Sequence, residues 1–89
     1  MTAIPCDREI GNWLADYVGE LIHAPGAEID RDGTFDSFGL DSAAAIGITG
    51  ELAQWLGIRI DPYVVDDHPT IRSLSLHLAA LVATEEVAA

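Results

Sequence analysis

The chain contains little positive charge. Among its 89 residues there is no lysine, and four arginines stand against fifteen aspartates and glutamates, which gives a formal net charge of −11. Nucleic acid binding requires Lys and Arg side chains that displace the counterions of phosphates. This balance excludes a nucleic-acid-binding function and favours partners with basic surfaces, with solubility as the alternative role of the acidity.

Cysteine and long apolar runs are also scarce. Cys6 is the only cysteine, so no intrachain disulfide can form, which suits a reducing cytoplasm. The first ten residues lack the basic and apolar regions of a signal peptide, and no apolar run approaches the roughly 20 residues that span a bilayer. We therefore expect a cytoplasmic protein without membrane contact. Its length fits one domain over residues 1–89, with an ordered core over about 7–83.

The first periodic segment predicts a helix over residues 7–24, with Asp7 as its N-cap and Pro25-Gly26 as its end. Three- and four-residue spacing places six apolar residues on its inner face: Ile10, Leu14, Tyr17, Val18, Leu21 and Ile22. Residues 25–41 have no clean period and form a long loop, which is more often functional than idle. We expect four apolar residues to pin this loop to the core: Ile29, Phe35, Phe38 and Leu40.

A second helix is predicted over residues 42–56, with Gly57 as the residue that ends it. Its expected inner stripe is Ile46, Thr49, Leu52, Ala53 and Leu56, with Ile48 and Trp55 beside it. Gly47 and Gly50 are unusual inside a helix, where each costs about 1 kcal/mol relative to alanine.

The remaining chain predicts two further helices. Asp61 and Pro62 open a short helix over residues 62–67, which Pro69 closes. Thr70 caps a last helix whose tail frays over residues 85–89 and whose inner face is Ile71, Leu74, Leu78, Leu81 and Val82. Residues 58–61 are the only strand candidate and are too short to build a sheet. The predicted fold is all-α, a small four-helix bundle of three main helices and one short helix.

Ser42 stands where the long loop ends and the second helix begins, after Gly39, Leu40 and Asp41. The free N–H groups and the dipole of a helix start favour a bound anion, so a phosphate attached there would be stabilised. The alternative is that Ser42 serves only as the N-cap of this helix. Ser37, which also follows an aspartate, lies inside the loop and is interpreted as a turn residue.

The wider sequence resembles the acyl carrier protein family, a group of four-helix bundles with a serine after Gly-x-Asp at the start of the second helix. Residues 39–42 match that motif in full, and Ile46, Ile48 and Leu52 match its aliphatic positions. Residues 56–58, Leu-Gly-Ile, match the turn that follows. The ending Asp67-His68-Pro69-Thr70-Ile71, with Leu74, His77, Leu78 and Ala79, is similar to carrier domains of modular polyketide synthases.

The resemblance implies that Ser42 carries a 4′-phosphopantetheine arm, with Gly39, Leu40 and Asp41 completing the motif. A phosphopantetheinyl transferase would attach the arm from coenzyme A with magnesium, and its thiol would carry acyl groups as thioesters. The domain would be a carrier and not an enzyme. Asp41 would contribute to transferase recognition, or would only act favourably on the helix dipole.

The resemblance also implies partners. These are the transferase, an acyltransferase or acyl-adenylate-forming ligase, and a ketosynthase or other enzymes of polyketide or related natural-product biosynthesis. The chain's own Met1 favours a free-standing carrier that acts in trans, and we expect a monomer.

The second helix departs from the family at the positions that partners recognise. Ala43 replaces the usual leucine, Gly47 replaces a common acidic residue, and Glu51 is the only acidic residue on this helix. Either partners read the surface by shape and apolar contact, or other acidic residues take over recognition: Asp36, Asp41, Asp61, Asp66 and Asp67. We hypothesise that the small residues Ala43, Ala44, Gly47 and Gly50 let a partner approach closely.

Other functions fit the sequence less well. Residues 28–39 partly match an EF-hand loop, but Gly39 stands where a bidentate glutamate is required, so calcium binding is not expected. An enzyme that pairs Ser42 with His23 or His68 would lack a nucleophile elbow, and no His/Cys cluster indicates zinc, so no metal site is predicted. A peptidyl or aryl carrier of a nonribosomal peptide pathway and an unmodified acidic helical adaptor remain as alternatives.

Overall fold

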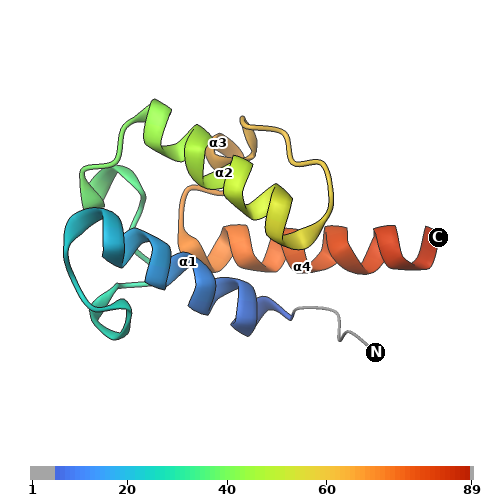
Figure 1. Ribbon diagram of the computed structural model, residues 1–89, viewed down its shortest axis with the longest axis horizontal. Coiled ribbons are helices and arrows are strands. Elements are labelled where there is room, and N and C mark those ends of the chain that lie inside the picture. Colours follow the sequence, from blue (N-terminus) through green and yellow to red (C-terminus); the bar gives the residue numbers. More distant parts are fainter. Residues whose placement is uncertain (1–5, 89) are drawn as a thin grey trace.

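The protein is an all-α bundle, as the sequence predicts. The computed structural model describes the backbone of residues 6–88 and the side chains of residues 6–41 and 43–83. Its α-helices are α1 (Asp7–Ile22), α2 (Ser42–Leu56), α3 (Val64–Asp67) and α4 (Ile71–Ala88) (Figure 1). Two short 3-10 helices, η1 (Gly26–Glu28) and η2 (Asp36–Phe38), lie in the loop between α1 and α2. Over residues 6–88 the only β-type pairing is an isolated bridge between Thr34 and Thr70.

A single apolar core joins the helices. In Figure 1, α1 and α2 lie on opposite sides of the first half of α4, and α3 lies behind α2. The largest fully buried side chains come from α1, α2 and α4: Ile10, Leu14, Val18, Ile48, Leu52, Ile71, Leu74 and Leu78. Because burying each such side chain contributes about 1.5–3 kcal/mol, these residues hold the three long helices together.

Two residues predicted to face the core, Ile46 and Leu21, are exposed, so the predicted inner faces of α1 and α2 are wrong at these positions. Ile46 is 51% exposed, whereas Ile48, expected beside the stripe, is 1% exposed. Two residues correspond to about 200° around a helix, so burying Ile48 turns Ile46 outward. Leu21, in the last turn of α1, is 45% exposed, whereas Ile22 beside it packs against the core.

Several helix ends differ from expectation. Cys6 occupies the N-cap position of α1, without a side-chain capping bond, so the prediction of Asp7 as the cap is wrong. The helix ends at Ile22 because His23 adopts a left-handed conformation (φ 61°). At the other end of the chain α4 continues to Ala88, beyond the predicted fraying point.

The short helix α3 begins two residues later than predicted. The carboxylate of Asp61 accepts a hydrogen bond from the backbone N–H of Tyr63 at 2.9 Å, and the Asp61 carbonyl accepts one from Val64 at 2.9 Å. Asp61 therefore closes a turn over Pro62 and Tyr63 before the helix starts. The predicted caps Gly57 and Thr70 are confirmed: Gly57 ends α2 with φ 71°, and the Thr70 hydroxyl accepts a hydrogen bond from Ser73 N–H at 3.1 Å.

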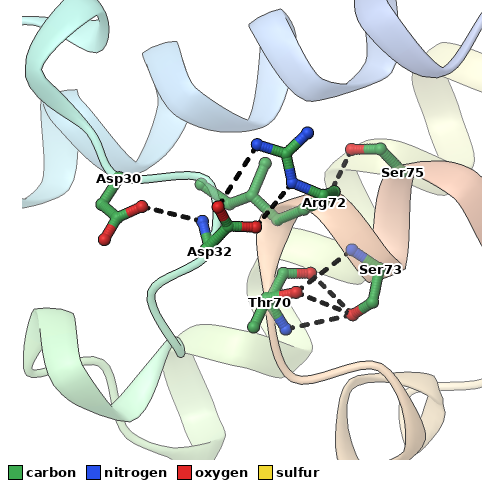
Figure 2. A network of polar contacts seen from close by, with 7 residues as sticks. Asp30, Asp32, Thr70, Arg72, Ser73 and Ser75 are labelled. Carbon is green, nitrogen blue, oxygen red and sulfur yellow. Dashed lines mark hydrogen bonds and ion pairs between the residues drawn. The ribbon is translucent and has the colours of Figure 1, made fainter.

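The long loop is pinned to the core, as predicted. Ile29, Phe35 and Leu40 are buried, and Phe38 packs against them. Backbone bonds also join the loop to the segment that enters α4: Phe35 N–H donates to Pro69 carbonyl at 3.0 Å, and Arg72 N–H donates to Arg31 carbonyl at 2.9 Å. The Asp32 carboxylate of the loop forms an ion pair with the Arg72 guanidinium of α4 (Figure 2). The loop thus delivers the start of α2 in a fixed position.

Candidate functional site: the loop-to-helix junction at Ser42

Gly39 makes the turn that leads into the motif. It ends η2 in a left-handed conformation, with φ 80° and ψ 16°, and its N–H donates to the Asp36 carbonyl at 2.9 Å. Residues with a Cβ atom adopt this conformation at a cost of about 1–2 kcal/mol, so the turn favours glycine. Gly39 therefore has a backbone role that explains its place in the motif.

Leu40 anchors the turn in the core. Its side chain is only 9% exposed, and its N–H donates to the Phe35 carbonyl at 3.2 Å. An apolar anchor directly before a helix fixes the angle at which the chain enters it. Leu40 is therefore a packing residue, and its burial fixes the position of Asp41 and Ser42, which follow it in the motif.

Asp41 is the N-cap of α2. Its backbone is extended (φ −87°, ψ −178°), and its Oδ1 accepts a hydrogen bond from Ala44 N–H at 2.9 Å. The hypothesis that Ser42 caps this helix is therefore wrong: α2 begins at Ser42, one residue inside the cap. The signal was present in the sequence, since aspartate is among the preferred N-cap residues.

Ser42 is thus the first residue of α2, although its side chain lies outside the described residues. The N–H groups of a first helical turn point toward the incoming chain and favour a negative charge. A phosphate group fits the backbone of this junction for that reason.

A groove of about 310 Å³ opens beside this junction. The loop contributes Thr34, Phe35, Asp36, Leu40 and Asp41, α2 contributes Ala45 and Ile46, and the α3 region contributes Pro62, Tyr63, Val65, Asp66 and Pro69. Its rim contains the two exposed apolar side chains Ile46 (51%) and Tyr63 (72%). Sequence reasoning missed this groove because it assigned Ile46 to the core.

The structure brings together three of the acidic residues predicted to contact partners. Asp36, Asp41 and Asp66 all line the groove, whereas Asp67 is exposed outside it. On α2, Ala43, Gly47 and Glu51 are all exposed on the outer face. A Cβ added at Gly47 or Gly50 would meet nothing within 4 Å, so this face is open to a partner.

Ser37, the other serine after an aspartate, is tied to the loop. It lies inside η2, where its hydroxyl donates to the Thr34 carbonyl at 2.6 Å and its N–H donates to the Thr34 hydroxyl at 3.1 Å. These bonds confirm its interpretation as a turn residue.

The acidic loop serves to fix its own backbone. The Asp30 carboxylate accepts from Asp32 N–H at 2.9 Å, and the Asp32 carboxylate accepts two bonds from the guanidinium of Arg72 at 2.5 and 3.3 Å (Figure 2). The hydrogen bonds from Arg72 hold the pKa of Asp32 below its ordinary value. Over the part of the chain whose side chains are described, no group of three His, Cys, Asp or Glu residues could hold a metal ion.

The histidines lie at helix ends or pack on each other. His23 ends α1, and the rings of His68 and His77 stack with their centroids 4.2 Å apart. His68 is thereby held at the junction of α3 and α4. Within residues 6–88, no helix is long and apolar enough to cross a membrane.

The chain matches the family described as the phosphopantetheine attachment site over residues 12–78. It is 33% identical to the acyl carrier protein TtuC of Teredinibacter turnerae, over 82% of this chain and 84% of that protein. It is 41% identical to erythronolide synthase EryA3 of Saccharopolyspora erythraea, over 97% of this chain but only 3% of the synthase. The solution structure of Asl1650, an acyl carrier protein of Anabaena with a variant phosphopantetheinylation-site sequence, superposes with a TM-score of 0.83 at 30% identity, covering 92% of this chain and 94% of Asl1650.

These matches define a small helical carrier domain of the phosphopantetheine-binding class. The chain belongs to the acyl carrier protein family, whose members hold their cargo on a covalent 4′-phosphopantetheine group. The resemblance drawn from residues 39–42 and from the segment around His68 is thereby confirmed at the level of the family.

Proposed function

We propose that this protein carries acyl intermediates as thioesters on a 4′-phosphopantetheine arm attached to Ser42, in the biosynthesis of a polyketide or a related natural product. The observation that supports the attachment site most strongly is the capping bond from Ala44 N–H to Asp41. Since Asp41 takes the capping role, α2 does not need the Ser42 hydroxyl for that purpose.

The groove beside α2 supports a role for this face in partner recognition. We propose that the transferase, the loading enzyme and a ketosynthase approach over Ala43, Gly47 and Glu51 and along the acidic rim formed by Asp36, Asp41 and Asp66. This acidic rim fits basic partner surfaces, because opposite charges accelerate encounter and fix orientation. Asp67, exposed next to Asp66 in α3, extends the recognition surface.

In this account the protein is a monomeric carrier domain that performs no catalysis. The loading enzyme is an acyltransferase or an acyl-adenylate-forming ligase. A substrate serine requires only access to a transferase, whereas a nucleophilic serine requires a base within hydrogen-bond reach. Of the two histidines that an enzyme could use as a base, His68 is stacked on His77 and His23 ends α1.

Mass spectrometry of the intact chain tests the proposal. The chain, Ser42→Ala and Ser37→Ala are each incubated with coenzyme A, magnesium and a broad-specificity phosphopantetheinyl transferase. We expect one phosphopantetheinyl group on the parent and on Ser37→Ala, and none on Ser42→Ala. Modification of folded Ser42→Ala would place the attachment at another residue and contradict the proposal. No modification of the folded parent beside a positive-control carrier would also contradict it, and would favour the unmodified adaptor.

A further inference from the structure

Three of the four arginines gather in one pocket away from α2. Arg8 of α1, Arg31 of the long loop and Arg72 of α4 line a pocket of about 210 Å³, together with Asp7, Gly11, Ile71 and Ser75. They come from segments up to 64 positions apart in the sequence, on a chain of net charge −11 that has no other cationic residue except Arg59. Asp7 and these three arginines together carry a net charge of +2, so the rest of the chain carries −13.

Two of the guanidinium groups are held in place by the fold. The Nη2 of Arg31 donates to the Asn12 side-chain oxygen at 2.5 Å, and Arg72 is fixed by its two bonds to Asp32. Figure 2 shows the Arg72 guanidinium projecting from α4 toward α1. Because these side chains are oriented before any ligand arrives, less conformational entropy is lost when they bind one.

The charges of the pocket are not fully compensated. Arg72 is paired with Asp32, but the partner of Arg31 is a neutral amide, and Arg8 makes no hydrogen bond or ion pair to any side chain among those the structure describes. Asp7 lines the pocket with one opposing charge, and the carboxylate of Asp30 also attracts Arg72. The pocket therefore retains donors for an additional anion.

Gly11 leaves the space that Arg31 occupies. A Cβ atom at Gly11 would lie 2.7 Å from Nη1 of Arg31 and 3.3 Å from Oγ of Ser75. The Arg31 side chain thus lies directly against the backbone of α1. A side chain at position 11 would displace the guanidinium without disturbing a backbone contact.

We infer that this pocket is a docking site for an acidic segment of a partner protein, which places its carboxylates on Arg8, Arg31 and Arg72. Guanidinium groups bind carboxylates by paired hydrogen bonds, and several of them can engage successive carboxylates of one segment. A peptide segment is favoured over a lone anion because its successive carboxylates can contact arginines that come from three separate elements. The pocket is lined by residues of α1, the long loop and the start of α4 and by none of α2, so a partner held here leaves the start of α2 accessible.

The site is independent of the proposed attachment at Ser42. The test is an NMR titration of the ¹⁵N-labelled full chain with a capped hexaglutamate peptide in 50 mM NaCl. We expect amide shifts at Arg8, Gly11, Arg31 and Arg72, the same result with Ser42→Ala, and binding that weakens severalfold in 500 mM NaCl because salt screens exposed charges.

Matched variants separate the pocket from overall charge. Arg8→Ala and Arg31→Ala remove one charge inside the pocket, whereas Arg59→Ala removes the same charge outside it. We expect about three- to tenfold weaker peptide binding for the first two and unchanged binding for Arg59→Ala, as expected for partly exposed charge pairs. Gly11→Ala should weaken binding while the fold is retained, because only the flexible end of Arg31 must move.

Four outcomes would overturn the inference. The first is a folded chain that shows no shifts with the peptide, and the second is an equal loss for Arg59→Ala and Arg8→Ala. The third is binding of inorganic phosphate at least as tight as binding of the peptide at the same residues, which would define a small-anion site instead. Self-association of the chain, checked by sedimentation at the NMR concentration, would assign the pocket to a second copy and would also overturn it.

Discussion

The Oδ1 atom of Asp41 accepts the backbone N–H of Ala44 at 2.9 Å, and this bond sets the first residue of α2. One carboxylate therefore caps the helix and places Ser42 at its start. Asp41 therefore has a structural role, the capping of α2, which can be tested separately from any role in recognition by a transferase.

Replacing Asp41 tests these two roles. Asp41→Ala should lower the free energy of unfolding by about 1 kcal/mol, because the N-cap acceptor is lost. Asp41→Asn keeps a capping oxygen and should remain within a few tenths of the parent. Urea denaturation of both variants measures the difference. Equal stability of parent and Asp41→Ala would contradict the capping role.

The same pair of variants addresses recognition. If the transferase reads the charge of Asp41, Asp41→Asn is modified more slowly although its stability is preserved. An unchanged rate would leave Asp41 with the capping role alone.

Replacing Gly39 by alanine should lower the stability of the fold, whereas replacing Gly50 by alanine should raise it. Gly39→Ala forces a Cβ into a left-handed conformation (φ 80°) and should cost about 1–2 kcal/mol. Gly50 lies exposed inside α2 with nothing within 4 Å of an added Cβ, so Gly50→Ala should add about 0.5–1 kcal/mol. Thermal denaturation compares the two. A loss of stability for Gly50→Ala would show that the outer face of α2 is not open.

The open face of α2 makes a prediction about partners. Gly47→Leu should fold like the parent, because a Cβ at this exposed position meets nothing within 4 Å. It should lower kcat/KM for phosphopantetheinyl transfer by about three- to tenfold if a partner approaches closely there. Gln54→Leu, exposed near the other end of α2, serves as the control. Unchanged transfer to Gly47→Leu would remove the hypothesis that small residues are needed on this face.

The pair formed by Asp32 and Arg72 predicts a pH dependence. Because the pKa of Asp32 is lowered in the folded protein by the hydrogen bonds from Arg72, its contribution to stability is complete above about pH 4 and is lost as pH falls through the lower native pKa. The effect is small, since both side chains are well exposed. Asp32→Asn should therefore converge with the parent in acid denaturation below that range and differ from it at neutral pH.

Much of this fold could be predicted from the sequence. The apolar repeats of α1 and α4, the start of α2 and the anchors Phe35 and Leu40 follow from spacing and from turn residues. Helix ends were harder, because His23 takes a left-handed conformation that favours glycine, and Asp61 closes a turn where the sequence is also compatible with a helix.

The face of α2 could not be read from periodicity alone. Ile46 and Ile48 are equally apolar, and only packing against the other helices decides which of them is buried. For the same reason the groove beside the motif, and the meeting of Arg8, Arg31 and Arg72, depend on contacts between segments far apart in the sequence. The motif residues were predicted, whereas the division of roles between Asp41 and Ser42 required the structure.

Locating the modified residue tests the central claim most directly. After incubation with coenzyme A and a phosphopantetheinyl transferase, the chain is digested and the peptide containing residues 36–50 is fragmented by tandem mass spectrometry. The account predicts the phosphopantetheinyl group on fragments that contain Ser42 and its absence from fragments that contain Ser37 alone. A group found on Ser37, or on any residue outside this peptide, would contradict it.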